Sequence, residues 1–160
     1  LSELCLESEE WKKRLKIRLV GPTDSSVLES IRVAQLNDNL EFIPYVKHNE
    51  VLELIMQPQV LMVILNQNAN EEGRVTGKIF EYVATGNKVL GIGSPTSDCA
   101  KVIDSCLAGS MIGFKEKDSI KNFLKSSFPV ELNKALNEKV MKYSRKNLTG
   151  ELIEILNSMV

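Results

Sequence analysis

Short apolar runs alternate along the chain with longer stretches whose apolar residues recur at helical spacing. The runs have the length of β-strands and are bounded by glycine, proline or polar residues. Strands separated by single helices indicate βαβ units and a parallel sheet. The predicted strands cover residues 15–20, 40–44, 60–65, 88–92 and 110–114.

Capping residues and breakers bound the predicted helices. Asp24 or Ser25 opens one helix, Asn49 opens another and Ser97 a third, because short polar side chains bond the free N–H groups of a helix start. Gly86 suits the position just past a helix end. The predicted helices cover residues 3–14, 24–36, 50–57, 77–85, 97–107 and 118–124, and two more follow residue 131 with a break near 147–150.

These elements predict an α/β fold, a Rossmann-like three-layer αβα sandwich formed by residues 1–160 as one domain. Right-handed crossovers favour a parallel sheet of about five strands in the order 3-2-1-4-5, followed by C-terminal helices. This order places the carboxyl ends of strands 1 and 4 side by side at the topological switch point, where such sheets bind ligands. The loops expected there are 21–26 and 93–97, with 66–76 nearby.

The composition agrees with a single globular domain. Of 160 residues, 43% are hydrophobic, which suffices for a core without disulfides. Charged residues make up 26% and the net charge is −1, so no basic field indicates nucleic acid and any anion site has to be local. No apolar run approaches the roughly 20 residues of a membrane span.

Cysteine usage and the first residues indicate the context of the chain. Cys5, Cys99 and Cys106 are an odd number without metal-type spacing, which indicates reduced thiols in a cytoplasmic protein. No signal peptide opens the chain. Because the chain starts at Leu1 without methionine, we expect a piece of a longer polypeptide.

The segment 76–90 carries the most specific chemistry. It is predicted as a loop, a short helix with Lys78 and Glu81 in its first turn, a glycine stop and a buried strand. Unpaired N–H groups at a helix start bind anions, and a nearby carboxylate suits the two hydroxyls of a ribose. The pattern indicates a nucleotide-diphosphate ligand.

At this segment the chain resembles a known family, the C-terminal, donor-binding domain of GT-B glycosyltransferases of the retaining, glycogen-synthase-like group (glycosyl transferases group 1). The resemblance rests on the strand ending at Gly21, the strands 40–45 and 60–65, and the motif Gly77-Lys78-Ile79-Phe80-Glu81-Tyr82-Val83-Ala84-Thr85-Gly86. It continues through Val89-Leu90-Gly91 and the helix and turn from Asp98 to Gly109, and so covers most of the chain.

The resemblance implies roles for individual residues. Glu81 matches the glutamate that accepts hydrogen bonds from the ribose hydroxyls. By the same resemblance, the loop at about Arg74–Gly77 is expected to lie along the diphosphate and the sugar, with the Thr76, Gly77 and Lys78 backbone at the phosphates. The substrate-binding residues expected on this basis are Glu81, Lys78, Gly77, Thr76, Arg74, Glu72 and Gly21.

The sequence departs from the family pattern at three places. Gly73 stands where the family often has a glutamate that contacts the donor sugar, and Glu72 just before it is the substitute candidate. The family often places cations soon after the first strand, but Gly21 is followed by no cation before Arg32. Asn87 and the following lysine replace the usual basic residue and proline before strand 88–92, a difference that we interpret as structural.

Each signal also has a plain structural interpretation. Lys78 and Glu81 are spaced as an ordinary helix-surface ion pair, and Arg74 and Lys78 could be solvated charges. The hydroxyls in loop 21–26 suit phosphate binding or simple capping. His48 has no nucleophile or metal partner in the sequence, and no D-x-D or His/Cys cluster predicts a metal site.

Three hypotheses about function remain. In the first, the chain is the donor-binding half of a glycosyltransferase of the hexosyltransferase type. Its donor would be a nucleotide-diphosphate sugar, such as a UDP-sugar, used in polysaccharide biosynthesis. We expect no cofactor and assign no catalytic residue. The acceptor, a glycan or a lipid-linked molecule, would bind an N-terminal domain that this sequence does not contain, so we expect the 160 residues alone to be inactive. The full-length protein could also associate peripherally with a membrane. The second hypothesis is a non-catalytic Rossmann-like regulatory or protein-interaction domain. The third is another GT-B enzyme such as a nucleotide-sugar epimerase.

Overall fold

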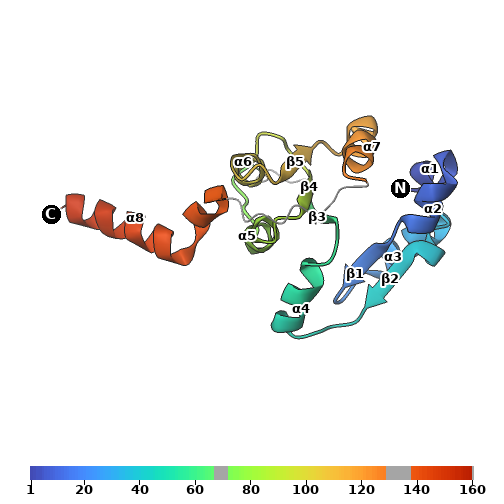
Figure 1. Ribbon diagram of the computed structural model, residues 1–160, viewed down its shortest axis with the longest axis horizontal. Helices are drawn as coiled ribbons and strands as arrows, with labels where there is room; N and C mark the ends of the chain where they lie inside the picture. Colours follow the sequence, from blue (N-terminus) through green and yellow to red (C-terminus); the bar gives the residue numbers. More distant parts are fainter. Residues whose placement is uncertain (67–71, 129–137, 160) are drawn as a thin grey trace. The chain divides into compact units, whose positions relative to one another are not determined.

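A computed structural model describes residues 1–66, 72–128 and 138–159, and its parallel strands and helices confirm the predicted α/β class (Figure 1). The chain forms two compact units, Leu1–Leu54 and Ile55–Val160. In chain order the elements are α1 (Ser2–Glu7), α2 (Glu9–Arg14), β1 (Ile17–Val20), α3 (Ser25–Val33), η1 (Asn37–Asn39), β2 (Leu40–Ile43), α4 (His48–Ile55), β3 (Val60–Ile64), α5 (Gly77–Ala84), β4 (Lys88–Ile92), α6 (Asp98–Ser105), β5 (Gly109–Ile112), α7 (Lys117–Ser126), η2 (Glu138–Tyr143) and α8 (Arg145–Ser158).

In the first unit, β1 and β2 form a two-stranded parallel sheet in which Ile17 lies opposite Leu40. Asn39 is buried just before β2. Its Nδ2 donates to the carbonyl oxygens of Lys12 and Leu15 at 2.8 and 2.9 Å. This amide therefore joins the turn between α2 and β1 to the beginning of β2.

Two helix starts differ from the prediction. The expected helix 3–14 is two helices, because Ser8 has extended backbone (φ −154°) and its hydroxyl accepts from the Glu10 N–H at 3.2 Å to cap α2. A serine that caps from inside a polar stretch is hard to tell from a solvent-facing helical serine. α4 begins at His48 rather than after Asn49.

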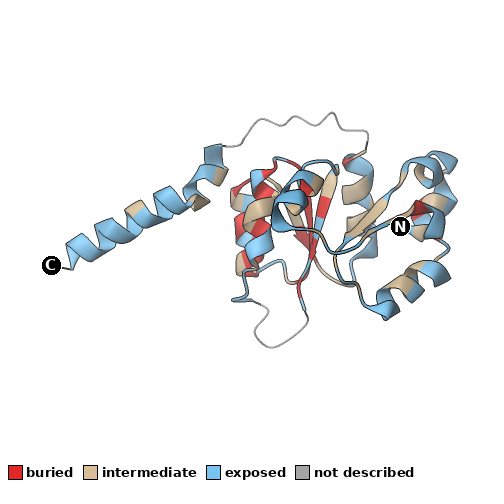
Figure 2. Cartoon of the chain, turned by 90° about the horizontal axis from the view of Figure 1, so that it is seen from below, coloured by how far each residue is buried: buried red, intermediate tan, exposed pale blue. Residues whose placement is uncertain are grey.

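The second unit holds a three-stranded parallel sheet in the order β3-β4-β5. Val60 lies opposite Lys88, and Val89 lies opposite Gly109. α5 and α6 pack together on this sheet, and most of the residues coloured as buried belong to these helices, these strands and their ends (Figure 2). The core consists of Val63, Leu65, Ile79, Val83, Val89, Cys99, Ala100, Val102, Ile103, Cys106 and Met111.

The predicted strand order 3-2-1-4-5 is wrong. β3 pairs with β4, and the described strands form two sheets, β1-β2 and β3-β4-β5. Apolar residues on both faces of 60–65 are typical of a strand that is covered on both faces, but Met62 and Ile64 are 47% and 55% exposed while Leu61 and Val63 are buried. The apolar pattern of a strand reports what covers its faces, whereas strand order is decided by hydrogen bonds along its edges.

The C-terminal segment is fixed to the core of the second unit through η2. The Tyr143 hydroxyl lies 2.9 Å from Ser105 Oγ, and its ring centroid lies 5.4 Å from that of Phe80. Ser144 then caps α8, which is exposed along its length (Figure 2). The predicted break near 147–150 is wrong, because α8 runs through Gly150 at the modest cost of one glycine in a helix.

Gly109 gives a direct test of the β4-β5 packing. A Cβ atom there would collide with the Val89 carbonyl oxygen, which is backbone and cannot move aside. We expect Gly109→Ala to lower the free energy of unfolding by about 2 kcal/mol or more. Gly150→Ala is the control, because its surroundings are open and alanine should stabilise α8 by about 0.5–1 kcal/mol. Urea denaturation followed by circular dichroism measures both, and equal effects would contradict the packing described.

Candidate functional site

The carboxyl ends of β3 and β4 lie at the same edge of the sheet because the strands are parallel. The Leu65 N–H donates to the Ile92 carbonyl at 2.9 Å and carries the pairing to that edge. The segment 72–76 leads into α5, and the loop 93–97 leads from β4 into α6. Parallel α/β sheets bind ligands at this edge.

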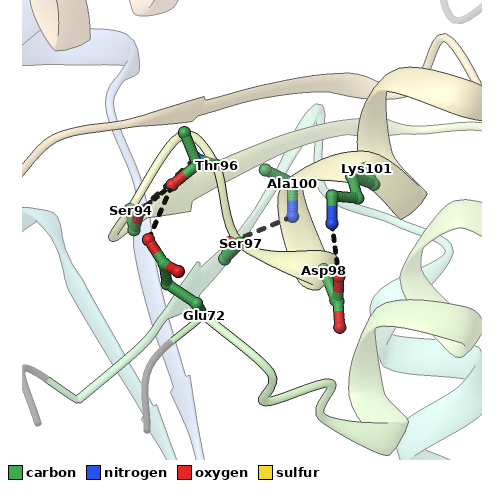
Figure 3. A network of polar contacts seen from close by, with 7 residues as sticks. All are labelled: Glu72, Ser94, Thr96, Ser97, Asp98, Ala100 and Lys101. Atoms are coloured by element: carbon green, nitrogen blue, oxygen red, sulfur yellow. Dashed lines mark hydrogen bonds and ion pairs between the residues drawn. The ribbon is translucent and has the colours of Figure 1, made fainter. Parts of the chain in front are cut away.

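Glu72 joins these two connections (Figure 3). Its Oε1 accepts from Thr96 Oγ1 at 3.1 Å, and its carbonyl oxygen accepts from the Asp98 N–H at 2.8 Å. Ser94 Oγ lies 2.8 Å from Thr96 Oγ1. The side chain and the backbone of Glu72 are thus both bonded to residues that precede or begin α6.

The N-terminus of α6 is capped by Ser97 (Figure 3). Ser97 is completely buried, and its Oγ accepts from the Ala100 N–H at 3.2 Å. Lys101 Nζ donates to Asp98 Oδ1 at 2.7 Å. This hydrogen bond and the charges of Asp98 and Glu72 raise the pKa of the Lys101 amine.

The N-terminus of α5 is different. Thr76 is its N-cap residue, but the Thr76 side chain makes no capping hydrogen bond. The backbone at Thr76 instead bonds the buried Cys99, which opposes the rise that burial causes in the pKa of that thiol. Ile79 and Val83 are buried in the core and hold α5 in place. Because α5 connects the parallel strands β3 and β4, it begins at the carboxyl edge of the sheet.

Charged side chains surround this helix start. Arg74 and Lys78 are exposed, and Glu81 is half-buried. Glu81 is the fifth residue of α5, which corrects the prediction that it lies in the first turn. Burial raises the pKa of the Tyr82 phenol, and the Glu81 carboxylate raises it further.

The helix α3 in the first unit, which follows β1, has a capped N-terminus, unlike α5. Gly21 has a φ of +92°, and Thr23 Oγ1 donates to its carbonyl oxygen at 3.2 Å. Asp24 Oδ1 accepts from the Ser26 N–H at 2.8 Å and caps α3. A carboxylate of the protein therefore already occupies the place where a phosphate would bind this helix.

The predicted site residues other than Gly21 all belong to the second unit. They lie on segment 72–76 and in the first two turns of α5. Asn87, which departs from the family pattern, lies at the other end of β4, where its Nδ2 donates to the Ile55 carbonyl at 2.9 Å. Sequence reasoning did not find the roles of Thr96 and Asp98, and the only signal for them was a run of hydroxyl residues after strand β4.

Other candidate chemistry is sparse in the part of the chain that the structure describes. His48 is exposed at the first position of α4. Among described residues, no group of three or more His, Cys, Asp or Glu side chains is placed to hold a metal ion. The cysteines at 5, 99 and 106 are free thiols. No described helix is both long and apolar enough to cross a membrane.

No family model and no curated protein sequence matches the chain. A solved structure does match: WaaG, a glycosyltransferase involved in lipopolysaccharide biosynthesis, superposes with a TM-score of 0.63 at 18% sequence identity. The chain has an α/β fold similar to that of part of this glycosyltransferase. The similarity covers 85% of this chain and 35% of the WaaG chain, so this chain spans about a third of its length. At this identity the comparison establishes the fold, and residue roles have to be argued from the geometry.

The cap of α3 predicts a dependence of stability on pH. Hydrogen bonds from Ser26 hold the pKa of Asp24 below its ordinary value. The ionised carboxylate therefore contributes stability above the unfolded pKa of about 3.9, and this contribution is lost as the pH falls through the lower, folded pKa. We expect Asp24→Ala to lower the thermal midpoint at pH 7, and the difference from wild type to shrink below about pH 4.

Asp24→Asn is the matched control for this effect, because it keeps a hydrogen-bond acceptor without the charge. Its difference from Asp24→Ala should stay constant with pH. Thermal unfolding followed by circular dichroism between pH 7 and pH 3 provides the comparison. A wild-type advantage over Asp24→Ala that did not change with pH would show that the ionised form has no special role in the cap.

Proposed function

We propose that this chain binds a nucleotide-diphosphate sugar at the start of α5 and is the donor-binding half of a glycosyltransferase. The proposal rests chiefly on the open N-terminus of α5, since Thr76 provides no side-chain cap whereas Asp24 caps α3 and Ser97 caps α6. Unpaired N–H groups and the helix dipole together favour a phosphate at such an end. The glycosyltransferase fold supports the same interpretation.

The surroundings of this helix start suit a diphosphate. Gly77 has open space where a side chain would stand, so a ligand can approach the backbone closely. Lys78 and Arg74 are exposed beside it and would supply the positive charge. The guanidinium can bond a phosphate in bidentate fashion, and the lysine acts as a point charge.

Glu81 would hold the nucleoside. It lies one turn beyond the proposed phosphate position on the same helix, and it remains half-exposed. A carboxylate accepts hydrogen bonds from two neighbouring hydroxyls, which matches the 2′ and 3′ hydroxyls of a ribose. UDP and GDP are the nucleotides to be tested, because neither the base nor the sugar is specified by these residues.

In the full-length enzyme, this half would position the donor and stabilise the leaving diphosphate. Lys78, Arg74 and the N–H groups of α5 would act on the developing charge, which is electrostatic catalysis in a preorganised site. We assign no nucleophile or general base in the described residues. The acceptor, a glycan or a lipid-linked molecule, would bind a separate N-terminal domain, and transfer would need both parts.

A non-catalytic Rossmann-like module is the second candidate function. The observation that favours it lies in the first unit, where the Asp24 carboxylate closes the start of α3 and the loop 21–26 contains no lysine or arginine. A chain of that kind would keep the fold and have lost its phosphate contacts. Nucleotide binding separates the two proposals.

Isothermal titration with UDP and GDP tests the proposed function. We expect one of the two to bind, and Glu81→Ala to weaken it by about 10- to 100-fold, because two hydrogen bonds to a charged acceptor are lost. Lys78→Ala should weaken binding by about 3- to 10-fold, with a smaller loss at high salt.

Matched substitutions away from the site serve as controls. The control variants are Glu154→Ala and Lys88→Ala. Glu154 lies on α8, Lys88 lies at the amino end of β4, and both residues are exposed. Neither should change the affinity. If wild type bound neither nucleotide at millimolar concentration, or if Glu81→Ala bound as well as Glu154→Ala, the proposed donor site would be wrong.

A further inference from the structure

The segment 72–76 is held at both of its ends. At one end, Glu72 bonds Thr96 through its carboxylate and Asp98 through its carbonyl oxygen. At the other end, Thr76 is the N-cap residue of α5, whose Ile79 and Val83 are buried in the core. Figure 3 shows the Glu72 end of this attachment.

These attachments matter because the segment between them is exposed. Residues 72–75 are exposed and belong to no helix or strand. α6, in contrast, is rigidly placed, since Cys99, Ala100 and Ile103 are at most 1% exposed in the core. A segment without its own core contacts takes its position from the element to which it is bonded.

We propose that Glu72 is a positioning residue that fixes segment 72–76, and with it Arg74 and the open start of α5, through its hydrogen bond with Thr96. This proposal rests on the proposed function for its ligand, a nucleoside diphosphate. Glu72 then acts on binding through the Thr96 hydroxyl and the segment that follows it, and it does not contact the donor sugar itself.

The positioning role and a direct contact with the ligand require different properties of Glu72. Glu72 Oε1 is already occupied by Thr96 Oγ1, which in turn lies within hydrogen-bond distance of Ser94 Oγ. A positioning role needs an acceptor oxygen at this place but no negative charge. A direct role of the carboxylate needs the charge and does not need Thr96.

Four variants use that difference. Glu72→Ala and Thr96→Val each remove the hydrogen bond, whereas Glu72→Gln keeps an acceptor oxygen and Thr96→Ser keeps the hydroxyl. We expect the first two to weaken UDP or GDP binding by about 3- to 10-fold, and the double variant to weaken it no further, because both remove the same interaction. Glu72→Gln and Thr96→Ser should bind within about twofold of wild type.

Amide hydrogen exchange gives a readout that needs no ligand. Exchange at residues 72–79 should become faster in Glu72→Ala and Thr96→Val and stay unchanged in the two conservative variants. Thr149→Val, an exposed threonine on α8, is the control for the threonine substitution. Thermal midpoints should change little in all of them, because an exposed hydrogen bond contributes little to global stability.

Several results would overturn the proposal. Equal loss of affinity in Glu72→Gln and Glu72→Ala, with none in Thr96→Val, would show that Glu72 uses its charge on the ligand. Unchanged amide exchange in Glu72→Ala and Thr96→Val would show that the Glu72–Thr96 hydrogen bond does not position the segment. Faster exchange without a loss of nucleotide affinity would show that the position of the segment does not affect binding. Failure of wild type to bind either nucleotide would instead refute the proposed function, and the exchange result would still decide whether Glu72 holds the segment.

Discussion

The packing of α5 and α6 against β4 is the constraint on which the candidate site depends. Ile79 of α5, Val89 of β4 and Ile103 of α6 are completely buried, and each such side chain contributes about 1.5–3 kcal/mol by its removal from water. This packing fixes the axis of α5 and so the place where its first N–H groups emerge. Residues 72–75 are exposed, and the segment is bonded to the beginning of α6 through Glu72. The position of the site therefore depends on the helix pair behind it.

Local patterns predicted the elements well because each element is bounded by a local event. Asp24 and Ser97 cap helices as expected, and the apolar runs became strands within a few residues of their predicted bounds. The strand order could not be read in the same way. The sequence of β3 has apolar residues on both faces. This pattern does not indicate that β3 pairs with β4 or that Met62 is exposed. The strand order depends on which strands compete to form hydrogen bonds with the same edge of a neighbouring strand.

In the candidate site, too, some features could be predicted from local sequence and others could not. Lys78 and Glu81 lie within one short helix, so their common location follows from local spacing. The bond between Glu72 and Thr96 joins residues 24 positions apart on the two connections that leave the carboxyl edge of the sheet. It becomes visible only when the pairing of β3 with β4 is known. The closed start of α3 was foreseeable as a capping pattern, and its consequence, that the protein's own carboxylate takes the anion position, required the observed Asp24–Ser26 bond.

The central claim is that a nucleoside diphosphate binds the open N-terminus of α5, and backbone amide chemical shifts report on it most directly. UDP and GDP would be added in turn to isotope-labelled protein while the N–H signals of the three helix starts are followed. The account predicts that the largest shifts occur at Gly77 and Lys78, with small ones at Ser25 and Ala100, whose helix starts are capped. Largest shifts at the start of α3 or α6, or none with either nucleotide, would contradict it.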